Sequence, residues 1–197
     1  MIYAVATQRP WGIEAYTALC QECSGHWRLI HDEEGWSLTP SPRYIFCLNW
    51  SDYVPPPLLE QHEVVNFHCT ALPYGRGGHP IENMILRGHT ETVITAHRMT
   101  AEVDAGPIYG VSPPVSLAGT KAEILHRFIQ PCVDLIRGII ETEPAPHPQG
   151  GGVVRFSRLT PAALRAFWGL GQAIAGGGIT TTVTEESTRI IVASKLG

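Results

Sequence analysis

The sequence predicts an α/β fold, with a largely parallel sheet in the first part of the chain and a short α+β tail after it. Short apolar runs typical of strands alternate with helical patterns over about the first 145 of the 197 residues. Those runs are apolar on successive residues, which is typical of parallel strands covered on both faces. We therefore expect an α/β unit over residues 1–145 and an extension over residues 146–197 with a strand, a helix and a hairpin.

The first third of the chain reads as a strand, a helix and further strands. Apolar runs predict strands at residues 2–6, 27–30, 44–48 and 64–67, and an apolar-periodic stretch predicts a helix over residues 13–23. Three consecutive prolines at 55–57 restrict that position to a turn or the start of a short helix, because proline lacks an amide N–H.

The rest of the chain is punctuated by glycine and proline. We expect a glycine-rich loop over residues 74–78, a helix over 80–87, a β-rich run over 92–99 and a strand after Pro107. Thr120 and Glu123 form a capping box that opens one helix, with a continuous apolar face to about Thr142. A Pro/Gly linker over 143–152 precedes a strand at 153–156, a helix from Thr160-Pro161, and a hairpin that pairs 180–184 with 189–193.

Composition excludes several classes of protein. Hydrophobic residues make up 44% of the chain and charged residues 16%, so a disordered chain is not expected. The net charge is −4 and Lys and Arg form no cluster, so we expect no nucleic-acid partner. No apolar stretch approaches the ~20 residues that cross a bilayer, and the N-terminus lacks a signal-peptide pattern. We expect no membrane segment and a cytoplasmic location.

The cysteines and histidines show no metal-like spacing. The five cysteines are irregularly placed and are predicted to be reduced, mostly buried thiols. Cys20-x-x-Cys23-x-x-His26 lacks the second ligand pair of a structural zinc site. Cys69 should point away from its neighbour His68 on a strand, which argues against a thiol nucleophile. We expect no metal, and interpret the remaining histidines of the middle region as scattered surface residues: His62, His79, His89 and His97.

Polar residues gather where one predicted strand ends. Asn66 and His68 should lie on the same side of the strand at 64–67, because side chains alternate. Ligands bind at the carboxyl ends of parallel strands, and Asp104 follows a later β-rich run. An amide donor, an imidazole and a carboxylate are the groups needed for acyl transfer to an amine.

These residues also resemble the signature of the folate-dependent formyltransferases. Asn66-x-His68 is followed by Leu72-Pro73, Arg76-Gly77 and Pro80, and then by Asp104-x-Gly106-Pro107. Several fixed positions recur in order over about forty residues, which makes the resemblance specific. It implies a Rossmann-like formyltransferase domain that takes N10-formyltetrahydrofolate as co-substrate.

The resemblance also implies roles for individual residues. Asn66 would donate a hydrogen bond to the developing oxyanion, and His68 would stabilise that charge or act as the general base. Asp104 would hold the imidazole in position or relay a proton through water. The residues expected at the folate are Trp50, Ser51, Met99, Val103 and Asp104. Those expected at the acceptor substrate are Trp11, Tyr74, Arg76 and Gly77. For Trp50 and Tyr53, a place in the core or at the rim is as plausible as a contact with the folate. For Arg76, a solvated loop position is as plausible as a contact with the substrate.

Within that family, the chain resembles the small amino-sugar-nucleotide N-formyltransferases of bacterial surface-polysaccharide biosynthesis. Pro10-Trp11, Asn49-Trp50-Ser51 and the loop at 73–78 carry this resemblance. Methionyl-tRNA enzymes continue into a C-terminal β-barrel, for which the roughly fifty residues after the linker are too few. Glycinamide ribonucleotide enzymes have a Gly/Ser/Asn-rich loop where this chain has residues 7–12. The expected partner is therefore a small-molecule nucleotide-linked amino sugar that presents a primary amine.

Two alternatives remain at this point. One is formylation of another small amine, either glycinamide ribonucleotide or a natural-product amine. The other is a non-catalytic folate- or nucleotide-binding module, because the stretch between residues 18 and 44 is short for the family. The apolar positions around Phe167-Trp168 are compatible with a homodimer.

Overall fold

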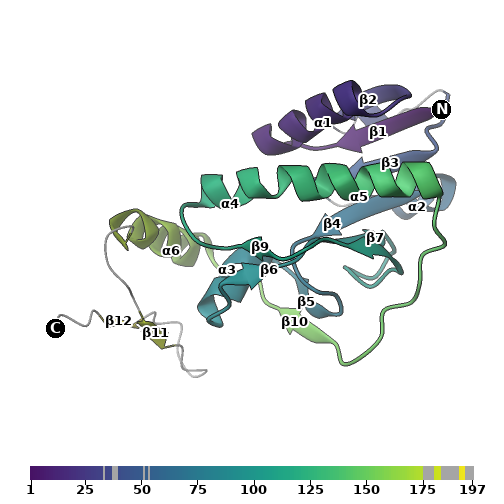
Figure 1. Cartoon of the computed structure of the whole chain (residues 1–197). Helices are drawn as coiled ribbons and strands as arrows, with labels where there is room; N and C mark the ends of the chain where they lie inside the picture. The colour runs from purple at the N-terminus through teal and green to yellow at the C-terminus, as the bar shows by residue number, and fades with distance from the viewer. Residues whose placement is uncertain are drawn as a thin grey trace.

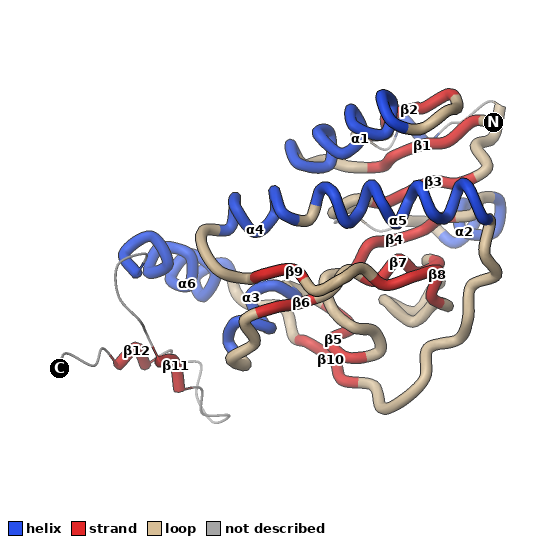
Figure 2. The backbone as a smooth tube through the Cα atoms, viewed as in Figure 1, coloured by secondary structure: helices blue, strands red, loops and turns tan. Residues whose placement is uncertain are grey.

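The fold is built on one six-stranded sheet (Figures 1 and 2). A computed structural model describes residues 1–32, 34–36, 40–50, 52, 54–174, 180–182 and 191–193. Across the sheet the strands are β2 (His26–Ile30), β1 (Ile2–Ala6), β3 (Tyr44–Cys47), β4 (Val64–His68), β7 (Thr95–Arg98) and β8 (Ile108–Val111). The first four are parallel, whereas β7 pairs antiparallel with both β4 and β8. The predicted α/β class with a mostly parallel sheet is confirmed.

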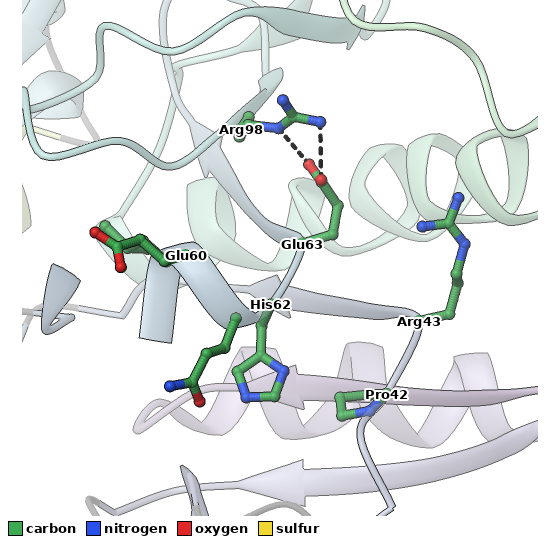
Figure 3. Close-up of a pocket in the computed structure, with 8 residues that line it drawn as sticks. Pro42, Arg43, Glu60, His62, Glu63 and Arg98 are labelled. Carbon is green, nitrogen blue, oxygen red and sulfur yellow. Dashed lines mark hydrogen bonds and ion pairs between the residues drawn. The ribbon is translucent and has the colours of Figure 1, made fainter. Parts of the chain in front are cut away.

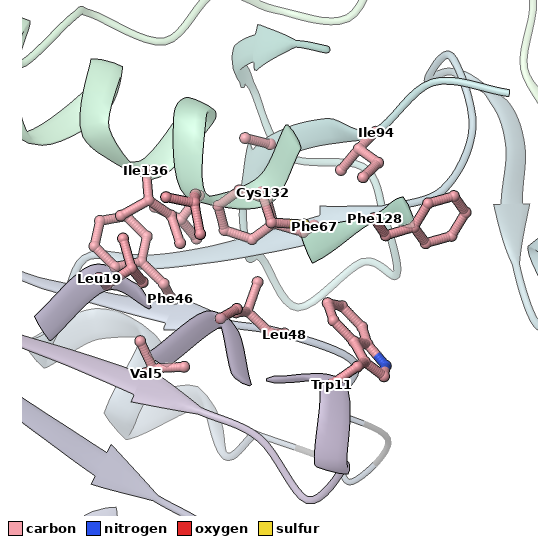
Figure 4. Packing of buried hydrophobic residues seen from close by; sticks show 14 of the residues in the cluster. Val5, Trp11, Leu19, Phe46, Leu48, Phe67, Ile94, Phe128, Cys132 and Ile136 are labelled. Atoms are coloured by element: carbon pink, nitrogen blue, oxygen red, sulfur yellow. The ribbon is translucent and has the colours of Figure 1, made fainter. Parts of the chain in front are cut away.

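Side-chain alternation gives the sheet two apolar faces. Helices α1 (Pro10–Glu22) and α5 (Ile129–Thr142) cover one face, where Leu19, Phe46 and Ile136 meet in the main core (Figure 4). The short helices η1 (Glu34–Trp36) and α2 (Pro56–Gln61) contribute to a smaller cluster that includes Ile45 and Val64. Full burial of such side chains contributes roughly 1.5–3 kcal/mol each. Both faces of the parallel strands are therefore covered, as their continuous apolar runs predict.

The expected single helix after Thr120 is two helices. The capping box is present: the Glu123 amide donates to Thr120 Oγ1 at 3.3 Å and the Thr120 amide donates to Glu123 Oε2 at 2.7 Å. The chain then forms α4 (Lys121–Arg127) and, after Phe128, α5. Pro131 explains the break, because it has no N–H for the Arg127 carbonyl and its ring crowds that carbonyl. The apolar face nevertheless continues across the break, since Phe128 is fully buried.

The expected glycine-rich loop at 74–78 is largely a strand, so that prediction is wrong. Tyr74–Gly77 forms β5, which pairs in parallel with β10 (Val154–Phe156). Gly77 has φ +114°, and a Cβ there would lie 2.4 Å from the Phe156 carbonyl oxygen. Glycine is therefore needed because the β10 backbone passes where a side chain would stand. The helix predicted next is present as α3 (Pro80–Leu86), and β6 (Glu91–Thr92) pairs with β9 (Val115–Ser116).

The last part of the chain contains the expected strand, helix and paired strands. Beyond β10 lie α6 (Pro161–Ile174), β11 (Thr180–Thr182) and β12 (Ile191–Ala193), and the last two pair antiparallel. The predicted turn between them lies outside the described residues. Contacts between β5 and β10 cross the expected boundary at 145, and the division into two units stays a prediction. Among the helices that the structure describes, none is long and apolar enough to cross a membrane.

Candidate active site

Three side chains, two from β4 and one from the loop after β7, converge at the carboxyl end of β4. Asn66 and His68 lie on β4, where alternation separates them from Val65 and Phe67 of the main core. Asp104 lies in the loop between β7 and β8. One carboxylate oxygen, Oδ1, lies 3.5 Å from Asn66 Nδ2, and the other, Oδ2, lies 3.5 Å from His68 Nδ1. The structure thus brings together the three residues that sequence reasoning selected.

His68 is buried and its tautomer follows from its contacts. The Nε2 atom lies 2.8 Å from the Gly75 carbonyl oxygen, which can only accept a hydrogen bond, so Nε2 carries a proton. In the neutral ring Nδ1 is then the nitrogen with a free lone pair, and it faces Asp104. Burial lowers the pKa of His68, and the nearby Asp104 charge opposes this only in part. The ring is therefore suited to take up a proton at Nδ1, next to a carboxylate that stabilises the resulting charge.

Asp104 stays ionised although it is largely buried. Burial raises the pKa of its carboxyl, but interactions with the His97 and His68 rings and with the Gly77 amide outweigh this, and the pKa lies below its usual value. The Gly77 N–H donates to Oδ2 at 2.9 Å. The residue also has φ +53°, in the left-handed region that non-glycine residues seldom adopt. Its placement thus depends on neighbours that hold the loop.

His97 is a residue of the site that sequence reasoning missed. It was expected at the surface, but it is only 1% exposed, because β7 pairs with β4 in a register that puts His97 opposite Asn66. Its Nδ1 donates to the Arg98 carbonyl at 3.0 Å, and its Nε2 faces Asn66 Nδ2 at 3.2 Å and Asp104 Oδ1 at 3.5 Å. The sequence feature that could have identified it is a titratable residue within the β-rich run over 92–99, whose other pattern predicts a buried strand.

These contacts leave one Asn66 N–H available. Because His97 Nδ1 donates to the Arg98 carbonyl, its Nε2 accepts one Asn66 amide hydrogen at 3.2 Å, whereas the contact of Asn66 with Asp104 Oδ1 is 3.5 Å and therefore weak. That second N–H can turn toward a negative oxygen without breaking a strong bond. The cluster therefore offers an oxyanion donor, a proton acceptor and a charge-stabilising carboxylate within a few ångströms.

The residues predicted at the acceptor substrate are mostly engaged within the protein. Arg76 is 8% exposed, so it is not a solvated loop residue; its guanidinium contacts Gln149 and Glu102. The Tyr74 ring packs edge-on against Phe156, and its hydroxyl contacts His89. Trp11 packs in the main core, and its buried indole N–H has no hydrogen-bond partner among the described residues. Gly77 serves Asp104 through its amide, and substrate contact for all four residues stays a prediction.

Two of the residues predicted at the folate lie against the same apolar cluster. Trp50 and Met99 pack against the cluster around Ile45 and Val64, on the sheet face opposite the main core. The indole N–H of Trp50 is buried and has no partner within the described part of the chain. Val103 is 61% exposed beside Asp104. Ser51, like Tyr53, lies outside the described residues.

Two alternative sites can be assessed from their surroundings. Cys69 packs beside the main core, away from Asn66 and His68, and burial raises its pKa to about 12, which argues against a thiolate nucleophile. A hollow of about 480 Å³ lies by Arg43 and Glu63, at the amino ends of β3 and β4 (Figure 3). It is at the opposite end of these strands from His68, and Arg98 and Glu63 pair across it. It is not part of the candidate active site.

Comparisons with known proteins agree with this geometry. The family model "Formyl transferase" matches residues 38–132. A methionyl-tRNA formyltransferase from Acidothermus cellulolyticus is 36% identical over 123 residues, which are 58% of this chain and 38% of that protein. The chain thus matches well under half the length of this curated relative.

Solved structures share the fold. A methionyl-tRNA formyltransferase from Clostridium thermocellum superposes with a TM-score of 0.79 at 24% identity, over 98% of this chain and 97% of that chain. The formyltransferase PseJ from Anoxybacillus kamchatkensis, in complex with UDP-4,6-dideoxy-4-formamido-L-AltNAc and tetrahydrofolate, has a TM-score of 0.60 at 15% identity, over 89% and 92%. The matched region holds Asn66, His68 and Asp104, so the part of the chain that carries the candidate site is similar to formyl transferases.

Proposed function

We propose that the chain transfers the formyl group of N10-formyltetrahydrofolate to a primary amine. The observation that carries this is the convergence of Asn66, His68 and Asp104 around one ionised, largely buried carboxylate. The co-substrate supplies an electrophilic formyl carbon. The chain's own residues supply what an attacking amine needs, namely a place for its proton and a donor for the oxygen that becomes negative.

In this proposal each residue has one task. His68 takes the amine proton at Nδ1, because Nε2 is committed to the Gly75 carbonyl. Asp104 stabilises the imidazolium that results, from 3.5 Å away. Asn66 donates its weakly held N–H to the developing oxyanion, and His97 keeps the other N–H in place. The formyl–N10 bond breaks as the new amide forms, and the proton on His68 returns to N10.

The apolar surface around Trp50 and Met99 lies on the same sheet face as Asn66 and His68 and supports folate binding there. Trp50 and Met99 offer flat and flexible apolar surface against which an aromatic ring can lie. The indole N–H of Trp50, which has no partner among the described residues, offers a donor to a polar atom of the bound molecule. PseJ, whose structure contains tetrahydrofolate, shares the fold and supports the assignment by analogy.

The acceptor has two candidates. A nucleotide-linked amino sugar is supported by the fold shared with PseJ and by the absence of a Lys/Arg cluster from the sequence. Methionyl-tRNA is supported by sequence, since the Acidothermus relative is 36% identical over 123 residues. Glycinamide ribonucleotide and other small amines belong in the same test.

The test combines the purified protein, N10-formyltetrahydrofolate and a panel of amino-sugar nucleotides, glycinamide ribonucleotide and methionyl-tRNA. Tetrahydrofolate release measures turnover, and calorimetry measures folate binding. Turnover with an RNA acceptor should weaken steeply as salt rises, whereas turnover with a small acceptor should not. Folate binding without turnover would indicate a non-catalytic module, and the loss of both would contradict the proposal.

A further inference from the structure

Gln149 lies in the linker between α5 and β10, a segment that carries no secondary-structure pattern. The linker is tied to the edge of β8, because His147 and Ile108 exchange backbone hydrogen bonds of 2.9 and 2.7 Å. Figures 1 and 2 show it running from the end of α5 down to β10. Two residues after His147, the half-buried side chain of Gln149 reaches the loop that carries Asp104.

The Gln149 amide makes four hydrogen bonds. Its Nε2 donates to the carbonyl oxygens of Asp104 and Gly106, both at 2.8 Å. Its Oε1 accepts from Arg76 Nε at 3.0 Å and Nη2 at 2.7 Å. The partners fix the orientation of the amide, because carbonyls only accept and a guanidinium only donates. The two N–H donors and both lone pairs of the amide oxygen are therefore used.

Those bonds connect both sides of the Asp104 carboxylate. On one side they hold the backbone of Asp104, which has φ +53° and needs its surroundings to keep it there. On the other side they hold Arg76, whose neighbour Gly77 donates its amide to Asp104 Oδ2 at 2.9 Å. One side chain thus braces the loop and the strand that together aim the carboxylate at His68.

We propose that Gln149 is a positioning residue for formyl transfer, which holds Asp104 where its carboxylate faces His68. This inference rests on the proposed function and deepens it. Gln149 acts through Asp104 and does not touch the reacting atoms. It lies seventeen positions beyond residue 132, where the family match ends.

The test compares Gln149→Ala and Gln149→Glu with the same changes at Gln130. Gln130 is an exposed glutamine of α5 whose amide, among the described residues, donates to Asp134, so it is a matched control. Gln149→Glu keeps an oxygen for Arg76 but replaces the N–H donors with an oxygen that faces two carbonyls. We expect kcat to fall by about 10- to 100-fold in both variants, because small misplacements of catalytic groups have effects of this size. KM for the formyl donor should stay within about threefold, and both Gln130 variants should match the wild type.

A second measurement follows the His68 ring by NMR titration, which needs no acceptor. The groups that face this ring are Asp104, His97 and the Gly75 carbonyl. The Asp104 charge favours the protonated ring, so its displacement in Gln149→Ala should move the His68 midpoint to lower pH. A merely structural role would lower the melting temperature and leave the midpoint of the folded protein unchanged.

Each outcome decides the proposal. Wild-type kcat in both Gln149 variants, or an unchanged His68 midpoint in folded Gln149→Ala, would overturn it. If Gln149→Ala does not fold, the kcat of Gln149→Glu decides the proposal, because the new carboxylate would itself shift the His68 midpoint. If the wild type itself turns over no acceptor, the proposed function fails, and the titration still shows whether Gln149 positions Asp104.

Discussion

At the scale of single residues, the hydrogen bonds of two buried histidines, His68 and His97, set the arrangement of the site. Each ring has one nitrogen committed to a backbone carbonyl: Nε2 of His68 to Gly75, and Nδ1 of His97 to Arg98. The remaining nitrogens face different oxygens of Asp104. His97 Nε2 also contacts the Asn66 amide, so in the proposed mechanism His68 accepts the proton of the attacking amine and His97 orients the Asn66 amide.

Asp104→Asn should nearly abolish turnover without unfolding the protein. The amide is the same size as the carboxylate but has no charge to stabilise a protonated His68, and general-base contributions are typically 10²- to 10⁴-fold. We expect kcat/KM to fall by about that range, measured by tetrahydrofolate release. Asp134→Asn, on the exposed face of α5, is the control and should match the wild type. Full activity in Asp104→Asn would contradict the role given to this carboxylate.

Activity should fall in acid with a midpoint below the ordinary histidine pKa of 6.5, because burial lowers the pKa of His68. Only the neutral ring can accept a proton, so kcat/KM should be at its plateau above the His68 pKa and fall as the pH drops through it. A pH–rate profile with the best acceptor measures this. An acidic limb with a midpoint above 6.5 would show that another group is the base or that His68 is not desolvated in the working enzyme.

At the scale of elements, the predictable parts were those set by local pattern. The strand at 64–67 and the shared face of Asn66 and His68 follow from burial and alternation. The strand β5 was missed because it exists through pairing with β10, about eighty residues away. The break at Phe128 was missed because the apolar face continues through it, although Pro131 is a local signal. His97 was missed because its partner strand sets its burial.

Gly77→Ala tests the close approach of β5 and β10. A Cβ at Gly77 would lie 2.4 Å from a backbone oxygen that cannot move cheaply, and its φ of +114° is strained for alanine. We expect a loss of about 1–3 kcal/mol in unfolding free energy, with reduced kcat because the Gly77 amide holds Asp104. Urea unfolding measures the first quantity.

The matched control is Gly138→Ala on α5. Gly138 is exposed, and a Cβ there meets nothing within 4 Å, so the change should stabilise the protein by about 0.5–1 kcal/mol through helix propensity. Equal effects of the two substitutions would show that the approach of β10 does not constrain β5.

At the scale of the whole molecule, the chemistry and its support come from different parts of the chain. The family match and the residues proposed for catalysis lie within residues 38–132. The loop that carries Asp104 is nevertheless held by Gln149, and β5 is held by Phe156, which is 4% exposed. Helix α6 contacts a different part of the molecule. Its Trp168 indole donates to the buried Glu82 carboxylate at 2.7 Å, and Lys121 forms an ion pair with the same carboxylate. The segment up to residue 159 should therefore matter for catalysis, and α6 for stability.

Two truncations separate these contributions. A chain ending at Thr142 keeps the matched region but loses Gln149 and β10. We therefore expect its kcat to fall by at least the 10- to 100-fold expected for a misplaced Asp104.

A chain ending at Leu159 keeps both Gln149 and β10, together with the hydrogen bond from the Leu159 amide to His79 at 2.9 Å. It should keep kcat within about threefold of the full chain. It should be less stable by about 1–2 kcal/mol, since Glu82 loses the indole donor but retains Lys121. Tetrahydrofolate release and urea unfolding measure the two effects. Activity in the shorter chain equal to that of the full chain would show that residues 1–142 position Asp104 without help from the linker or β10.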